Sequence, residues 1–122
     1  MGFNIVVLET DPRVAQSLAG MLSSHFHAVH VTRSGKEFRE RVAKNRPDAV
    51  VLDIEHSRLT DVRGLHNDFP SLPIVCTHRL PDEELWIAAL EAGAADVCQS
   101  GDVQNVVASV LRSVAVAKSA AA

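Results

Sequence analysis

The sequence has few cysteines, no cluster of basic residues and no long hydrophobic run, and each deficit argues against a class of protein. Its two cysteines, Cys76 and Cys98, are too far apart for a CxxC motif. Each ends a strand-like run, which favours two buried free thiols over a redox pair. The 12 basic and 15 acidic residues give a net charge of −3 without a basic stripe. We therefore expect no nucleic-acid binding through this domain, because phosphate contacts need clustered Lys or Arg.

Signals for export or membrane insertion are also missing. Residues 1–4 carry no basic segment and lead directly into a strand pattern, unlike a signal peptide. The most apolar stretch, residues 103–117, contains Gln104, Asn105 and Arg112, and we do not expect it to span a bilayer. These features predict a cytoplasmic protein that does not act on membranes.

The length and composition fit one compact domain. A chain of 122 residues, of which 47% are hydrophobic and 22% charged, resembles an ordinary globular protein. At this length folding buries well over half of the surface of the unfolded chain, so the fold needs no disulfide or metal. We assign residues 1–117 to the domain and expect the Ala-rich residues 118–122 to be a frayed tail or the start of a linker.

Short apolar runs alternate with longer helical patterns five times along the chain. The expected strands cover residues 5–8, 28–32, 49–53, 73–77 and 96–99. The expected helices begin at Pro12, Ser34, Thr60, Asp82 and about Asp102. This alternation predicts an α/β fold of the (βα)5 type, with a doubly wound, parallel five-stranded sheet covered on both faces.

The functional crevice of such a sheet lies beyond the C-terminal ends of its strands. The residues at these ends are 9–11, 53–56, 77–78 and 99–100. They include Glu9, Asp11 and Asp53, whose carboxylates could converge from separate loops on one Mg²⁺, a cation that prefers oxygen ligands. One of these carboxylates could then act as a nucleophile toward a phosphoryl group.

Together with the order of elements, three segments resemble the receiver domain of two-component response regulators. They are Glu-Thr-Asp-Pro at 9–12, Pro-Asp-Ala-Val-Val-Leu-Asp at 47–53 and Leu-Glu-Ala-Gly-Ala-Ala-Asp at 90–96. The resemblance covers residues from about 4 to 115 and implies a flavodoxin-like signalling domain that is not an enzyme. It implies that Asp53 accepts a phosphoryl group from a sensor histidine kinase. The implied Mg²⁺ ligands are Glu9, Asp53, the backbone carbonyl of Glu55 and, as a third acidic neighbour, Asp11.

Several positions depart from the receiver pattern. Thr10 falls where the family has its main carboxylate ligand, so we expect weakened Mg²⁺ binding. Ser100 falls on the family's Lys and forgoes a charge-assisted hydrogen bond worth roughly 1.5–3 kcal/mol. Val97 falls on the aromatic switch position, so we expect no aromatic switching. The family's hydroxyl residue falls on His78, or on Thr77 if the loop is one residue shorter. His78 could supply a donor and, when protonated, a positive charge.

Other side chains at the surface and crevice leave alternatives open. Leu85 and Trp86 could form a partner or homodimer patch from the fourth and fifth helices, or Trp86 could be an isolated surface aromatic. His56 and His78, with Glu55, could form a metal site. The remaining clustered histidines share no obvious face and are expected at the surface: His25, His27 and His30.

Three functions are therefore compatible with the sequence. The first is a response-regulator receiver in a phosphorelay, with Asp53 as acceptor and Mg²⁺ as cofactor. The second is a pseudo-receiver that binds protein partners without phosphorylation. The third is a small metal-dependent enzyme using His56 and His78, for which no nucleophile–base pair stands at a recognisable spacing.

Overall fold

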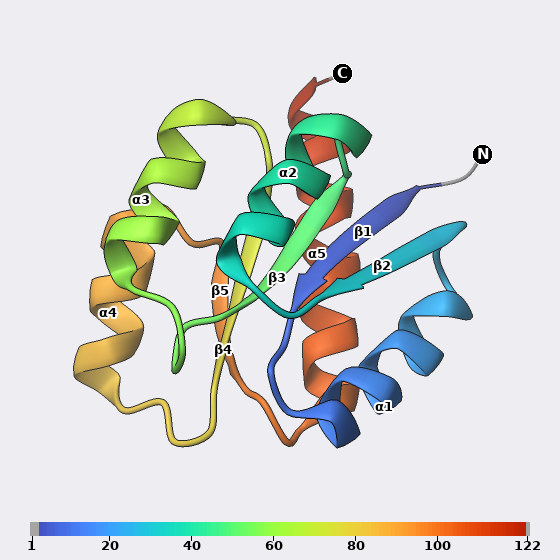
Figure 1. Cartoon of the computed structure of the whole chain (residues 1–122). Helices are drawn as coiled ribbons and strands as arrows, with labels where there is room; N and C mark the ends of the chain where they lie inside the picture. Colours follow the sequence, from blue (N-terminus) through green and yellow to red (C-terminus); the bar gives the residue numbers. More distant parts are fainter. Residues whose placement is uncertain (1–2, 122) are drawn as a thin grey trace.

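Five parallel strands form one sheet at the centre of the molecule (Figure 1). The computed structural model describes residues 3–121, so Met1, Gly2 and Ala122, which belong to the two predicted segments, lie outside it. The strands are β1 (Asn4–Leu8), β2 (Ala28–Thr32), β3 (Ala49–Asp53), β4 (Ile74–His78) and β5 (Asp96–Gln99). The helices are α1 (Pro12–Ser23), α2 (Gly35–Asn45), α3 (Leu59–Asp68), α4 (Glu83–Ala92) and α5 (Val103–Ala121).

The strand order β2-β1-β3-β4-β5 places β1, β3 and β4 inside the sheet and β2 and β5 at its edges. Adjacent strands are parallel throughout, for example with Asp53 of β3 opposite Thr77 of β4. Such connections need crossover helices, which here cover both faces of the sheet (Figure 1). The predicted doubly wound α/β fold is confirmed.

Two hydrophobic layers hold the helices to the sheet. Successive side chains of a strand point to opposite faces, so Val6 and Leu8 of β1 enter one layer and Ile5 and Val7 enter the other. The first layer joins the sheet to α2, α3 and α4, and the second joins it to α1 and α5. Strands buried on both faces need continuous apolar runs, which explains the β-branched runs in β1 and β3.

Helix starts coincide with side chains that cap them. Asp11 precedes Pro12 and its Oδ1 accepts a hydrogen bond of 2.9 Å from the backbone N–H of Arg13. Ser34 and Asp82 cap α2 and α4 in the same way. These residues satisfy backbone donors that have no partner inside the helix, and their positions agree with the predicted helix starts.

Several element boundaries and the C-terminal segment differ from the expectation. Strand β1 and helix α3 begin one residue earlier, and strand β4 begins and ends one residue later. The residues expected as a frayed tail continue α5 as far as Ala121. Lys118 within this segment forms a 2.8 Å ion pair with Asp48 and lies over the ring of Phe3. Because Ala is a strong helix former, an ordered Lys118 is enough to extend the helix.

None of the helices in residues 3–121 combines the length and the hydrophobicity that crossing a membrane requires.

Candidate functional site

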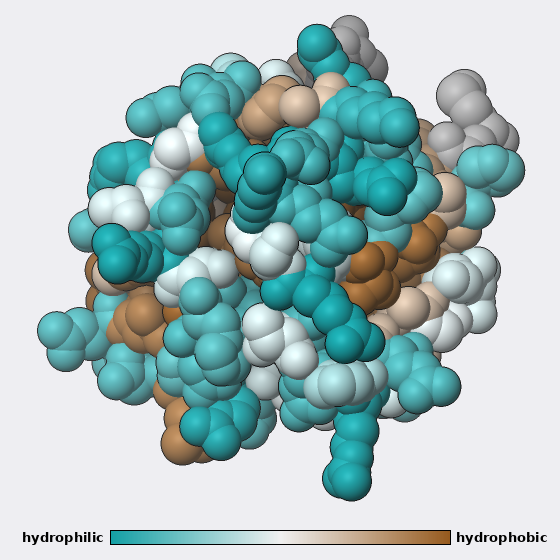
Figure 2. All heavy atoms as spheres, viewed as in Figure 1, coloured by the Kyte–Doolittle hydropathy of each residue, from teal (hydrophilic) through white to brown (hydrophobic). Residues whose placement is uncertain are grey.

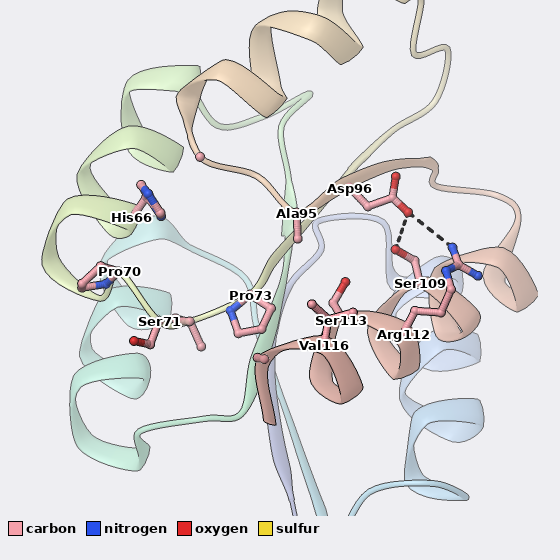
Figure 3. Close-up of a pocket in the computed structure, with 13 residues that line it drawn as sticks. His66, Pro70, Ser71, Pro73, Ala95, Asp96, Ser109, Arg112, Ser113 and Val116 are labelled. Carbon is pink, nitrogen blue, oxygen red and sulfur yellow. Dashed lines mark hydrogen bonds and ion pairs between the residues drawn. The ribbon is translucent and has the colours of Figure 1, made fainter. Parts of the chain in front are cut away.

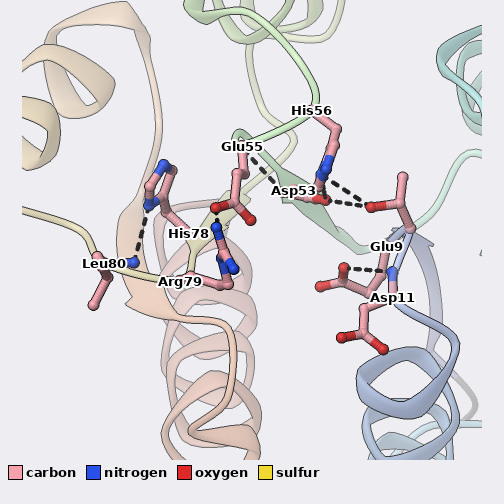
Figure 4. A network of polar contacts seen from close by, with 9 residues as sticks. Glu9, Asp11, Asp53, Glu55, His56, His78, Arg79 and Leu80 are labelled. Carbon is pink, nitrogen blue, oxygen red and sulfur yellow. Dashed lines mark hydrogen bonds and ion pairs between the residues drawn. The ribbon is translucent and has the colours of Figure 1, made fainter.

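The loops after β1, β3, β4 and β5 surround a hollow of about 770 Å³ at the C-terminal edge of the sheet. Its lining residues are Glu9, Asp11, Val14, Glu55, His56, Arg79, Leu80, Gln99, Ser100 and Gly101. Figure 4 shows several of these side chains around the end of β3. The location agrees with the rule for parallel sheets, because the ends of neighbouring strands meet there.

Asp53 lies at the end of β3 with only 3% of its surface exposed. Its Oδ1 accepts a 2.9 Å hydrogen bond from the backbone N–H of Glu55. Its Oδ2 accepts a 3.1 Å hydrogen bond from the Thr10 hydroxyl and lies 2.8 Å from His56 Nδ1. Both carboxylate oxygens are therefore held, one by the backbone and one by two side chains (Figure 4).

Glu9 places a second buried carboxylate beside Asp53. Its Oε2 accepts a 3.1 Å hydrogen bond from the backbone N–H of Asp11, whereas its buried Oε1 has no hydrogen-bond partner among the described residues. Burial raises the pKa of Glu9, and the charges of Asp53 and Asp11 also raise it, against smaller lowering by backbone hydrogen bonds. A carboxylate in this state gains from a nearby cation, so the Glu9–Asp53 pair fits a hard divalent ion such as Mg²⁺.

His56 is joined to this site by contacts that the sequence did not predict. Its Nδ1 lies 3.0 Å from Thr10 Oγ1 as well as 2.8 Å from Asp53 Oδ2, although 56% of its side chain is exposed. Hydrogen bonding to Asp53, and the charge of Asp53, raise the pKa of His56. The signal was its position, three residues after an Asp that ends a strand, where a turn brings the ring back to that Asp.

Arg79 was missed by sequence reasoning. It directly follows β4, and its Nε donates a 2.8 Å hydrogen bond to Glu55 Oε1 at the rim of the hollow. The side chain is 77% exposed, so the guanidinium can reorient. Its position immediately after a central strand is the signal that could have identified it, because that edge of the sheet carries the site.

Thr77 and His78, the two candidates for the family's hydroxyl position, have different environments. Thr77 is the register partner of Asp53, and its buried Oγ1 has no hydrogen-bond partner within residues 3–121. His78 Nδ1 accepts a 3.0 Å hydrogen bond from the backbone N–H of Leu80. The ring of His78 is thus engaged by the β4–α4 loop, and the donor role predicted for it stays a prediction.

Three further predicted residues occupy distinct places. Asp11 lines the hollow and caps α1 through its own carboxylate. Ser100 is 8% exposed, lines the hollow and donates its backbone N–H to the carbonyl of His78 at 2.9 Å. Val97 packs against the layer beneath α4 and contacts a small hollow that Trp86 also lines.

Of the two residues predicted to form a surface patch on α4, Trp86 is exposed and Leu85 is not. Leu85 packs against the hydrophobic layer, whereas Trp86 is 44% and Ile87 45% exposed. Leu90 on the same helix is also exposed. Figure 2 shows hydrophobic surface over α4 and beside β1 and β2, on a face that is otherwise mostly hydrophilic. The exposed large hydrophobic residues of α4 are therefore Trp86, Ile87 and Leu90.

A group of metal-binding side chains forms at the end of β3. Asp53, Glu55 and His56 each offer a ligand atom, and these atoms lie within 4.8 Å of one another. This group shares His56 and Glu55 with the metal site considered from the sequence but has Asp53 in place of His78. In the part of the chain that the structure describes, no other group of three such residues gathers, and His25, His27 and His30 form none.

A separate hollow of about 440 Å³ lies at the opposite end of β4 and β5, between the α3–β4 loop and α5 (Figure 3). Asp96 is the acidic residue in it. Its Oδ2 accepts a hydrogen bond from Ser109 and forms an ion pair with Arg112. This hollow has one acidic residue, whereas the edge that carries Asp53 has several acidic residues around its hollow.

Known proteins provide three comparisons. The chain is 35% identical over 99 residues to the response regulator MprA of Mycobacterium sp. (strain KMS), a match covering 79% of this chain and 43% of that relative. It is 32% identical to the BeF3-activated N-terminal receiver domain of Klebsiella pneumoniae RstA, with a TM-score of 0.77 and coverage of 89% and 95%. The N-terminal signal receiver domain of a two-component response regulator from Bacteroides fragilis has a TM-score of 0.82 at 20% identity, covering 91% and 95%.

These matches differ in what they establish. The Klebsiella domain is matched over almost its full length at above 30% identity, whereas the Bacteroides domain supports the fold alone. No family model matches the chain. The chain spans less than half the length of the MprA relative, so activities of that whole protein do not transfer to it directly.

Proposed function

Because this chain belongs to the receiver domains of two-component response regulators, we propose that it accepts a phosphoryl group on Asp53 in the presence of Mg²⁺. The observation that carries this proposal is the pairing of two buried carboxylates, Asp53 at the end of β3 and Glu9 directly after β1. Asp53 is 3% exposed, and Glu9 beside it keeps an oxygen without a hydrogen-bond partner among the described residues.

Asp53 would act as the nucleophile. One of its carboxylate oxygens attacks the phosphorus of a phosphohistidine in a sensor kinase, forming a P–O bond as the P–N bond breaks. The electron pair of that P–N bond leaves with the imidazole of the kinase, which then takes a proton from solvent. Attack by Oδ2 requires that Thr10 or His56 first release this oxygen, since both contact it at hydrogen-bond distance.

Glu9, Asp53 and the backbone carbonyl of Glu55 would hold the Mg²⁺ ion. When bound, the ion supplies positive charge that neutralises the phosphoryl oxygens. Asp11 uses Oδ1 to accept from the backbone N–H of Arg13, so it would join these ligands through Oδ2. With Thr10 adding a hydroxyl but no charge, we expect a weaker site than three carboxylates would form.

Arg79 is our candidate for the positive charge that Ser100 does not provide. Ser100 lines the hollow with a neutral hydroxyl, whereas Arg79 at the rim carries a guanidinium suited to phosphoryl oxygens. Its pairing with Glu55 keeps it next to Asp53 before the phosphoryl group arrives. The exposed Arg79, which follows β4, would thus supply the positive charge in this pocket.

A pseudo-receiver is the second candidate, favoured by the contacts already made by Asp53. Thr10 and His56 occupy Oδ2 and the backbone occupies Oδ1, so the carboxylate is satisfied without ligand. In that case the exposed hydrophobic residues of α4, together with α5 on the other side of β5, would bind a partner or a second copy of the chain.

Intact-mass spectrometry after treatment with acetyl phosphate separates the two functions. We expect the wild-type chain in Mg²⁺ to gain the mass of one phosphoryl group, and Asp53→Ala to gain none. Removing Mg²⁺ with EDTA should abolish the adduct. If the wild-type chain gains no mass, and beryllofluoride with Mg²⁺ leaves its thermal stability unchanged, the pseudo-receiver is the better description.

A further inference from the structure

The side chain of His56 adds a nitrogen donor to an acceptor site that is otherwise built from oxygen. We propose that His56 makes this a site for a transition-metal divalent cation, such as Ni²⁺ or Co²⁺, with the imidazole as ligand beside Asp53 and Thr10 and with the carboxylate of Glu9 as a nearby negative charge. This inference deepens the function proposed above, because it concerns the same pocket and names the class of cation it selects.

Three donor atoms already have the spacing of ligands on one ion. Asp53 Oδ2 and His56 Nδ1 are 2.8 Å apart, His56 Nδ1 and Thr10 Oγ1 3.0 Å, and Thr10 Oγ1 and Asp53 Oδ2 3.1 Å. Neighbouring ligands of an octahedral ion, each bound at about 2.1 Å, are separated by about 3.0 Å. The triangle therefore matches one face of a coordination octahedron, with a carboxylate, an imidazole and a hydroxyl at its corners.

Glu9 provides an independent observation that points to a cation. It is 96% buried, lines the same hollow as His56, and its Oε1 has no hydrogen-bond partner in the described chain. Figure 4 shows its carboxylate directed into the space enclosed by the loops beneath Asp53. A buried carboxylate oxygen without a partner is costly, and a cation shared with Asp53 would relieve that cost.

The residue types determine which cation gains most. Mg²⁺ binding depends on negatively charged oxygen ligands, and Thr10 contributes a neutral hydroxyl to this site. An imidazole nitrogen adds little for Mg²⁺ but suits Ni²⁺, Co²⁺ and Zn²⁺. The combination of Thr10 and His56 therefore lowers the affinity for Mg²⁺ and raises the affinity for transition metals.

The proposal has one direct competitor in the same geometry. Thr10 and His56 could serve only as hydrogen-bond donors that hold Asp53, with no role in metal selection. Replacing the imidazole of His56 by an amide of similar length separates these two roles. The amide keeps a polar side chain that can hydrogen-bond Asp53, but it removes the nitrogen ligand. His56→Asn makes that exchange, and His78→Asn is its matched control, since His78 is bonded to the backbone of Leu80.

Calorimetric titration of the full chain with NiCl₂ and, separately, MgCl₂ tests the proposal at about pH 8, where most imidazoles are deprotonated. We expect His56→Asn to lose about tenfold or more in Ni²⁺ affinity, the usual cost of disturbing one metal-binding side chain, and less than about threefold in Mg²⁺ affinity. His78→Asn should change neither. Co²⁺ should give a visible absorption band with the wild-type chain that weakens in His56→Asn.

Other outcomes overturn the proposal. Ni²⁺ affinity that survives His56→Asn would assign the binding to surface histidines, and an equal loss for both ions would assign His56 a structural role. Thermal melts of the three proteins check folding, which we expect to persist because the His56 side chain is mostly exposed. These equilibrium titrations do not depend on phosphorylation. If His56 does not select the metal but acetyl phosphate still modifies Asp53, only the metal proposal fails. If His56 selects the metal but Asp53 is not modified, only the proposed function fails.

Discussion

Individual side chains at the end of β3 carry most of the chemistry of this molecule. Asp53 and Glu9 are buried acids, Thr10 and His56 contact the first of them, and Arg79 stands at the rim. Electrostatics among these five groups determine how strongly the site attracts a cation and a phosphoryl group. Two predictions follow from single residues.

Glu9→Gln should stabilise the folded chain at neutral pH. Burial raises the pKa of Glu9 in the folded chain above its value in the unfolded chain. Ionisation of Glu9 therefore destabilises the folded chain. This destabilisation is absent below the unfolded pKa and is complete once the pH has risen through the folded pKa. Removing the charge should raise the unfolding free energy at pH 7 by on the order of 1 kcal/mol. Urea denaturation at pH 7 and at about pH 4 measures it, and the gain should shrink at the lower pH.

Magnesium provides the control for this substitution. Because Mg²⁺ binds the folded chain only when its ligands are present, adding it should stabilise the wild type more than Glu9→Gln. If Glu9→Gln is no more stable than the wild type when both are measured without Mg²⁺, Glu9 is not an uncompensated buried carboxylate.

Arg79→Ala should slow modification of Asp53 by acetyl phosphate about tenfold, because a charge-assisted hydrogen bond to a phosphoryl oxygen is worth roughly 1.5–3 kcal/mol. The rate is measured by the growth of the phosphorylated mass under fixed Mg²⁺. Arg63→Ala, which removes an exposed arginine of α3, is the control and should react as the wild type does. Equal rates in all three proteins would exclude a role for Arg79 in phosphoryl binding.

At the scale of helices and strands, one glycine connects two elements. Gly93 ends α4 with a φ of 117°, a conformation that residues with a side chain rarely adopt. A Cβ built at this position would lie 2.5 Å from Cγ of His66 on α3. The chain therefore needs glycine at position 93 for two reasons. Glycine adopts the positive φ, and its lack of a Cβ lets α3 and α4 approach each other.

Gly93→Ala should destabilise the fold by about 2 kcal/mol or more, the combined cost of a strained backbone and a steric clash. Gly64→Ala is the matched control, because Gly64 lies within α3 and a Cβ there meets no atom within 4 Å in the described structure. That variant should gain up to about 1 kcal/mol from the higher helix propensity of alanine. Thermal and urea unfolding of both variants compare them, and equal stabilities would refute the contribution of Gly93.

For the whole molecule, the two hydrophobic layers should open together when the domain unfolds. Cys76 belongs to the layer under α2, α3 and α4, and Cys98 to the layer under α1 and α5, so the thiols report on opposite faces of the sheet. Burial raises the pKa of Cys76 to about 12 and that of Cys98 to about 11. Both thiols are therefore protonated and shielded at neutral pH, where only the thiolate reacts.

Labelling with a chromogenic disulfide reagent at pH 8 tests this expectation. Neither thiol should react in the folded protein on the time scale of minutes, and both should react at once in concentrated guanidinium. Through the denaturation range, we expect equal labelling rates for the two residues, as a two-state domain requires. Faster labelling of Cys98 alone would show that the α1–α5 layer opens independently.

The sequence alone determined the architecture and the location of Asp53, because local patterns specify local structure. Buried strands on both faces need continuous apolar runs, and Asp11, Ser34 and Asp82 cap helices through hydrogen bonds to the next few residues. Strand β3 is therefore recognisable as a run that ends in a carboxylate. The identification of a parallel sheet then places that carboxylate at the functional edge.

Only the tertiary structure decided which side chains meet there. The contact of Thr10 with Asp53, and the position of Arg79 beside Glu55, join loops that follow different strands. The C-terminal part of α5 is tied by Lys118 to Asp48, which lies 70 residues earlier in the chain. Such pairings depend on how loops close over a finished sheet, and no local periodicity encodes them. The position of the acceptor was therefore readable from the sequence, while the partners that control it were not.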